Sequence, residues 1–115
     1  MTRPYQIIDS RVALEALATR LQETERMALD TEFVWDRTYY ARLGVVQIGL
    51  EDGTSFLVDA VAVPDLSPLG EVLADDGIEK ILHDAPQDLM ILRRATGAQV
   101  RRVFDTRLAA GFAGM

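Results

Sequence analysis

The sequence predicts an α/β fold, a mixed sheet with helices on its faces. Three observations favour it. An amphipathic segment precedes three short apolar runs, and helix-like and strand-like segments then alternate to the end of the chain. The third observation is composition, because 49% hydrophobic and 26% charged residues are typical of a globular domain. At 115 residues, one domain with one core is expected.

Composition also excludes several classes of protein. Cysteine is absent, which excludes a disulfide framework and a thiolate metal site. No stretch approaches the roughly 20 apolar residues of a membrane helix. Residues 1–5 lead into no long apolar run, so no signal peptide is expected. We therefore expect a cytoplasmic protein without a membrane partner.

Charge is distributed unevenly along the chain. The net charge of −6 argues against attraction to nucleic acid by overall charge. Residues 1–90 carry a net charge of −10, whereas residues 91–115 carry five arginines against Asp105 alone. Arginine favours bidentate contacts to carboxylate or phosphate. Two interpretations stay open, a solvated helix face with salt bridges or a set of phosphate contacts.

The first half of the chain is predicted to form one helix and three strands. A helix over 10–25 follows Ser10, a good N-cap, and carries apolar residues at helical spacing. Strands are expected at 27–33, 43–50 and 54–59. The last two are joined by a Glu-Asp-Gly turn, which predicts an antiparallel hairpin.

Helices and strands are predicted to alternate in the second half. Ser67 is the expected N-cap of the first helix, and Asp84 with Gln87 forms a capping-box pattern for the second. Gly97 suits the end of that second helix, and Asp105 is expected to cap the last one. The predicted ranges are helix 69–74, strand 78–83, helix 84–95, strand 100–104 and helix 107–112.

Two carboxylates lie two residues apart in the first predicted strand. Asp30 and Glu32 share one face of that strand, while Thr31 and Phe33 point to the other. Like charges on one face repel each other, and a bound Mg²⁺ or Mn²⁺ would remove that penalty. A solvent-facing strand without a metal remains the alternative, since this short pattern is common.

Further polar groups follow the later strands. Asp88 lies in the first turn of a predicted helix, near the crevice where open α/β sheets bind ligands. Its alternative role is to complement the helix dipole. His83 is the only histidine, and either a hydrogen-bonded structural role or a ligand role fits it. An aromatic and basic segment follows the acidic strand. It either stacks bases and contacts phosphates or serves ordinary packing, and its residues are Trp35, Arg37, Tyr39, Tyr40 and Arg42.

Four segments in this order resemble the ribonuclease D branch of the DEDD superfamily of 3′→5′ exonucleases. In chain order they are the LDTEF segment at 29–33, the segment 39–48, the HDAPQDL segment at 83–89 and the segment 104–110. Together they are far more specific than any one of them.

The resemblance implies a ribonuclease H-like mixed sheet with antiparallel strands 1–3 and then parallel strands, flanked by helices and incomplete at the C-terminus. It also implies hydrolysis of phosphodiester bonds from an RNA 3′ end by two divalent ions, Mg²⁺ or Mn²⁺. It assigns catalysis and metal binding to Asp30, Glu32 and Asp88, and substrate binding to Thr31, Phe33 and His83. Asp105 is interpreted as a helix cap rather than a ligand.

The family's third motif, a Tyr or His followed by a metal-binding Asp, is expected a few dozen residues beyond Asp105. Residues 1–115 do not contain it. We therefore expect a single-domain fragment, the N-terminal portion of an exonuclease domain, inactive or nearly so alone. The expected substrates are RNA 3′ ends such as tRNA precursors, and a second copy of the chain could cover the truncated face. A DNA-directed exonuclease and a non-catalytic RNA-binding or interaction domain remain alternatives.

Overall fold

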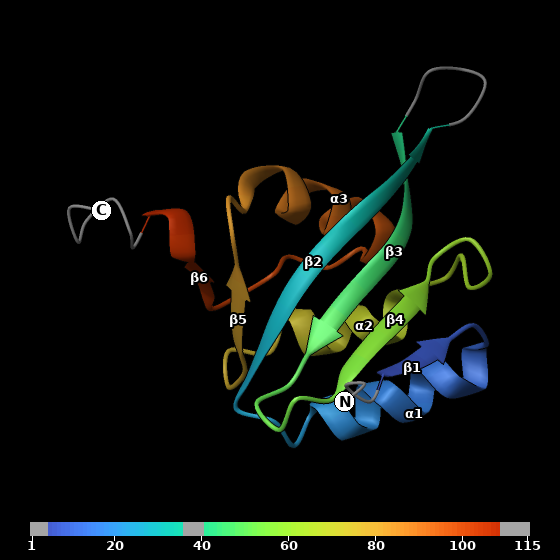
Figure 1. Ribbon diagram of the computed structural model, residues 1–115, viewed down its shortest axis with the longest axis horizontal. Coiled ribbons are helices and arrows are strands. Elements are labelled where there is room, and N and C mark those ends of the chain that lie inside the picture. The colour runs from blue at the N-terminus through green and yellow to red at the C-terminus, as the bar shows by residue number, and fades with distance from the viewer. Residues whose placement is uncertain (1–4, 36–40, 109–115) are drawn as a thin grey trace.

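A six-stranded mixed sheet carries three helices in the computed structural model, which describes residues 5–35 and 41–108 (Figure 1). The strand order is β1-β4-β3-β2-β5-β6. No helix in these two ranges is long and apolar enough to cross a bilayer. The elements are β1 (Tyr5–Ile8), α1 (Arg11–Leu21), β2 (Arg26–Trp35), β3 (Ala41–Gly49), β4 (Ser55–Asp59), α2 (Ser67–Leu73), β5 (Glu79–Leu82), α3 (Pro86–Thr96) and β6 (Val103–Asp105).

The sheet combines antiparallel and parallel pairing. β3 pairs antiparallel with both β2 and β4, and the predicted hairpin of β3 and β4 turns at Gly53, whose φ of +89° suits glycine. β5 pairs parallel with β2, and β6 pairs parallel with β5. The predicted mixed sheet is therefore confirmed.

The first strand, β1, is not predicted by the sequence. β1 pairs parallel with β4, from Tyr5 beside Ser55 to Ile8 beside Val58. Only Ile8 of its four residues is buried, so the segment carries no alternating apolar pattern. Its stability comes from hydrogen bonds to a distant strand, which local sequence does not reveal.

Two helix starts differ from the predicted caps. α2 begins at Ser67 itself, and the Asp65 carboxylate accepts the Ser67 N–H at 3.0 Å. α3 has Ala85 as its N-cap without a side-chain cap, so the predicted capping box is wrong. Asp84 adopts a left-handed φ of 58°, which places it outside the helix. Asp105 supplies the acceptors there instead, as described below.

Other boundaries shift by a few residues. α1 ends at Leu21 rather than 25, because the chain turns directly after Gln22. α3 ends at Thr96, and the φ of +77° at Gly97, its C-cap, confirms the predicted C-terminal glycine. β6 starts three residues later than expected, and of the predicted last helix only the start, through 108, lies within the described residues.

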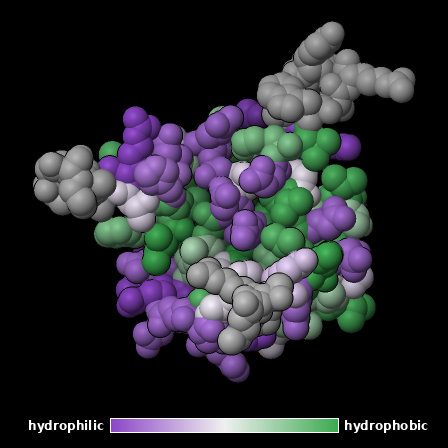
Figure 2. All heavy atoms as spheres, in the orientation of Figure 1, coloured by the Kyte–Doolittle hydropathy of each residue, from purple (hydrophilic) through white to green (hydrophobic). Residues whose placement is uncertain are grey.

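One face of the sheet forms the core. Figure 1 shows α2 and α3 behind the strands, and α2 packs against both α1 and α3. The opposite face has no helix over it in the described residues, and apolar side chains lie among polar ones there (Figure 2). The strand side chains buried in the core are Ile8, Met27, Leu29, Thr31, Leu43, Val46, Ile48, Phe56, Val58, Lys80 and Leu82.

Candidate active site at the end of β2

The acidic pair lies on the outer face of β2. Asp30 and Glu32 are exposed, whereas Thr31 between them is only 7% exposed. The alternation of a strand therefore places both carboxylates on one face, as predicted, and this face lies away from the helices. A β-bulge follows between Glu32 and Phe33. Bulges of this kind re-aim side chains and occur often next to active sites.

β2 continues past the end of its neighbour. β5 pairs with β2 only as far as Ala28, so the following stretch of β2 has no strand on that side within the described residues. The Asp30 carboxylate accepts the Thr31 N–H at 3.0 Å. The pair thus sits where one parallel strand stops and another continues, and such places commonly bind ligands.

Thr31 connects the acidic strand to α3. Its hydroxyl donates to Oδ1 of Asp88, which lies in the first turn of α3, 57 residues away in sequence. Its backbone N–H donates to Asp30. One threonine therefore binds two of the three predicted metal ligands, and the structure brings the first and second motif segments together at this residue.

The donor chemistry suits a hard cation. The carboxylate oxygens of Asp30 and Glu32 are ligands that Mg²⁺ and Mn²⁺ prefer, and both side chains are exposed. Asp88 instead binds Thr31, whose side chain is on the opposite face of β2. Among residues 5–35 and 41–108, no three His, Cys, Asp or Glu side chains converge closely enough to hold a metal. The Asp30 and Glu32 carboxylates suit a divalent ion in their chemistry. Asp88 binds Thr31 and does not converge with them.

Asp105 determines where α3 begins. Its carboxylate accepts the N–H groups of Ala85 at 2.8 Å, Asp84 at 3.0 Å and Arg107 at 2.9 Å. These backbone hydrogen bonds, that of Ala85 first, lower the pKa of Asp105. The prediction of a capping role is confirmed, and it extends to the loop before α3. Asp105 thereby helps to position the helix that carries Asp88.

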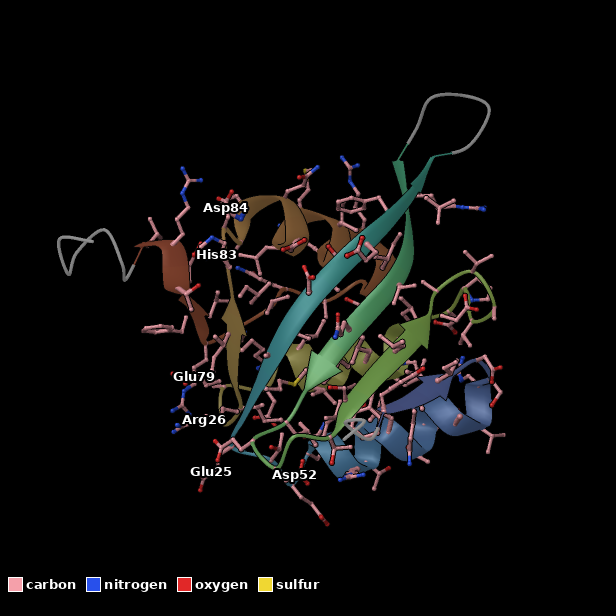
Figure 3. The ribbon with its side chains drawn as sticks, in the orientation of Figure 1. Glu25, Arg26, Asp52, Glu79, His83 and Asp84 are labelled. Carbon is pink, nitrogen blue, oxygen red and sulfur yellow. The ribbon has the colours of Figure 1, made fainter. Side chains whose placement is uncertain are left out.

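His83 lies at the end of β5, next to Asp84 (Figure 3). Its Nδ1 is 2.8 Å from the hydroxyl of Thr106, and that hydroxyl donates to the Leu82 carbonyl at 3.4 Å. These contacts match the structural alternative for His83. Substrate binding by His83 and by the half-buried Phe33 stays a prediction.

The C-terminal arginines divide into two groups. Arg101 pairs with Asp76 at 3.5 Å, Arg102 donates to the Asp76 carbonyl at 3.4 Å, and Arg107 pairs with Asp84 at 3.0 Å. The salt-bridge interpretation therefore holds for Arg101 and Arg107, whereas Arg102 binds a backbone carbonyl. The remaining two, in the last turn of α3, are exposed. Of the predicted base-stacking wall, the Trp35 side chain and residues 36–40 lie outside the described structure.

Comparison with known proteins places this arrangement in a family. A family model described as "3′-5′ exonuclease" matches residues 5–115. Ribonuclease D of Desulfotalea psychrophila is 53% identical over 108 residues, which are 94% of this chain and 29% of that protein. Ribonuclease D of Escherichia coli is 39% identical over 111 residues, 96% of this chain and 29% of that protein. The chain thus spans less than a third of these relatives.

Solved structures agree. The crystal structure of Escherichia coli RNase D, described as an exoribonuclease involved in structured RNA processing, superposes with a TM-score of 0.87 at 36% identity, covering 100% of this chain and 30% of that one. The catalytic core of RRP6 from Trypanosoma brucei gives 0.89 at 28% identity, covering 99% and 32%. The resemblance to ribonuclease D-type exonucleases and the ribonuclease H-like fold class are confirmed. The chain belongs to the 3′-5′ exonuclease family.

Proposed function

We propose that this chain forms the N-terminal portion of the catalytic domain of a 3′→5′ exoribonuclease, which hydrolyses phosphodiester bonds from an RNA 3′ end. The observation that carries the proposal is the contact of Thr31 with Asp88, which joins the two motif segments at the end of β2. The relatives named ribonuclease D, and the neighbour described as acting in structured RNA processing, support RNA as the substrate.

In this proposal Asp30, Glu32 and Asp88 supply carboxylate oxygens to divalent ions, Mg²⁺ or Mn²⁺, two in the complete domain. Such ions stabilise charge on the attacking and leaving oxygens of a phosphodiester. Thr31 holds Asp88 at the strand through its hydroxyl. The 3′-terminal nucleotide lies beside Thr31, Phe33 and His83.

The proposal extends beyond residues 1–115. Because the chain spans 29% of its ribonuclease D relatives, we propose that further metal ligands and RNA contacts lie in the rest of such a protein. This chain alone then trims RNA slowly or not at all. A cytoplasmic location, tRNA precursors as substrates and a second copy packed on the truncated face belong to the same proposal.

The test is 3′ trimming of a 5′-labelled RNA by a protein that carries residues 1–115 with its downstream sequence. With Mg²⁺ or Mn²⁺ the wild type should shorten the RNA from its 3′ end. Asp30→Asn should slow this by at least about 100-fold, because it removes a metal-binding charge. Glu25→Gln is the matched control, an exposed acid just before β2, and should trim like the wild type.

Retained trimming by Asp30→Asn would contradict the metal role. A matched DNA strand that is shortened faster than the RNA would favour the DNA-directed alternative. RNA binding without trimming by the wild type would favour the non-catalytic alternative.

A further inference from the structure

A pocket of about 320 Å³ opens on the helix-covered side of the sheet. The start of β3, the segment after β4 and the C-terminal half of α3 form it. This volume lies at the lower end of the range for small-ligand sites. Its lining residues are Arg42, Leu43, Ala60, Val61, Pro64, Leu66, Ile91, Arg94 and Ala95.

The lining combines an apolar wall with two cations. Every lining residue except Arg42 and Arg94 is apolar, and no acid is among them. Both arginines are exposed, and neither forms an ion pair with an acid of the described residues. They differ in this from Arg101 and Arg107, which pair with acids. The pocket is therefore a positive, apolar recess in a chain of net charge −6.

The pocket borders the elements of the candidate active site. Ile91 lies one helical turn beyond Asp88 on α3, and Ala95 lies two turns beyond it, about 10 Å along the helix. On the strand side, Leu43 pairs with Phe33. Because Asp88 lies in the first turn of the same helix, α3, a chain molecule with its end beside Asp88 could reach this recess with a neighbouring unit.

We propose that this pocket binds one nucleotide of single-stranded RNA, with the base against the apolar wall and the phosphate on Arg42 and Arg94. The proposal rests on the proposed function and adds a substrate-binding subsite to it. Guanidinium groups bind phosphate in a bidentate manner and also stack on bases. Apolar recesses with a few placed polar groups are typical of ligand sites.

The test is a fluorescence anisotropy titration of the 115-residue chain with a 5′-fluorescein 12-nucleotide oligo(U) in EDTA. Without divalent ions no cleavage occurs, and binding alone is measured. Arg42→Glu and Arg94→Glu should each weaken binding by about 10-fold or more, since each removes a phosphate contact and repels the phosphate. Val61→Asp, at a site 52% exposed, should do the same without disturbing the core.

Arg93→Glu is the matched control, because Arg93 is an exposed neighbour on α3 that does not line the pocket. It makes the same change in net charge and should weaken binding by no more than about 3-fold. Equal losses of RNA affinity for Arg93→Glu and Arg94→Glu would show that the RNA is held only by non-specific charge attraction, and would overturn the proposal. So would a wild-type chain that does not bind, or that binds matched oligo(dT) more tightly than the RNA.

This test is separate from the test of the proposed function. The anisotropy titration contains no metal ion, and Glu25→Gln, at an exposed acid outside the pocket and the candidate active site, should bind the RNA in EDTA like the wild type. A chain that binds through the pocket, in a protein that does not trim RNA, would overturn the exonuclease proposal and leave the pocket proposal standing.

Discussion

Thr31 is buried between two carboxylates, and its two donors serve different partners. Strand alternation predicted that its side chain faces away from Asp30 and Glu32, and this is confirmed. Its contact with Asp88 was not predictable, because strand and helix are 57 residues apart and meet only through the sheet topology. The sequence therefore predicts which residues are acidic and adjacent, but not which hydroxyl joins them.

Replacing Thr31 tests whether this hydroxyl supports metal binding. Thr31→Val keeps the shape but leaves Asp88 without its donor, so Mn²⁺ affinity should fall by about 10- to 100-fold. Folding stability should fall by about 1–3 kcal/mol. Thr31→Ser keeps the hydroxyl and should restore most of the affinity. Isothermal titration calorimetry measures the Mn²⁺ affinity. Equal affinity for Thr31→Val and the wild type would show that the hydroxyl does not support metal binding.

Asp105 makes the folding stability of the chain depend on pH in the acidic range. Its pKa in the folded chain is below the ordinary value of 3.8, so the charged form favours folding. That stabilisation is fully present above pH 3.8 and is lost as the pH falls through the lowered pKa. Asp105→Asn should lower the melting temperature at pH 7 and flatten its fall between pH 5 and 2.

Thermal melts across this pH range measure the effect. Glu23→Gln, at an exposed acid of the turn after α1, is the control and should melt like the wild type. An unchanged acid dependence in Asp105→Asn would show that the contacts with Ala85 and Asp84 carry little weight.

At the scale of elements, the sequence predicted most helices and strands but not how two helices start. The capping box at Asp84 and Gln87 is a valid local pattern, yet Asp84 takes a left-handed conformation and Asp105 of β6 supplies the acceptors. β1 was missed for a similar reason, because its partners lie about 50 residues away. Local patterns fail where a distant element provides the hydrogen bonds.

β5 carries the one lysine of the chain into the core. Lys80 is fully buried, and its ammonium group donates to the Asp75 carbonyl. Burial lowers its pKa from the ordinary value of 10.5, against the opposing charges of Asp75 and Asp76. The stability of the wild type should therefore rise with pH between the lowered pKa and 10.5, as the unfolded chain still binds the proton there.

Replacing Lys80 separates its volume from its charge. Lys80→Met fills the same space without a buried charge and should change stability at pH 7 by about 1 kcal/mol or less, without the rise toward pH 10.5. Lys80→Ala leaves a cavity and should cost about 2–4 kcal/mol. Urea unfolding measures both. A loss above about 3 kcal/mol in Lys80→Met would mean that the bond to Asp75 is itself essential.

At the scale of the whole molecule, charge is organised by position. The chain has a net charge of −6, yet the pocket beside α3 is lined by arginines and no acids. The acids lie elsewhere. Glu25 and Asp52 lie near the start of β2 (Figure 3), and Asp30 and Glu32 lie within that strand. Net charge alone therefore says little about whether this chain binds RNA.

The central claim is that Asp30 and Glu32 within β2, and not Glu25 and Asp52 near its start, bind divalent ions. Paramagnetic line broadening by Mn²⁺ in amide NMR spectra of the chain tests it most directly. We expect the amides at 29–33 and 86–90 to broaden first, and we expect Asp30→Asn, but not Glu25→Gln, to abolish this broadening. Broadening centred on Glu25 and Asp52, or undiminished in Asp30→Asn, would contradict it.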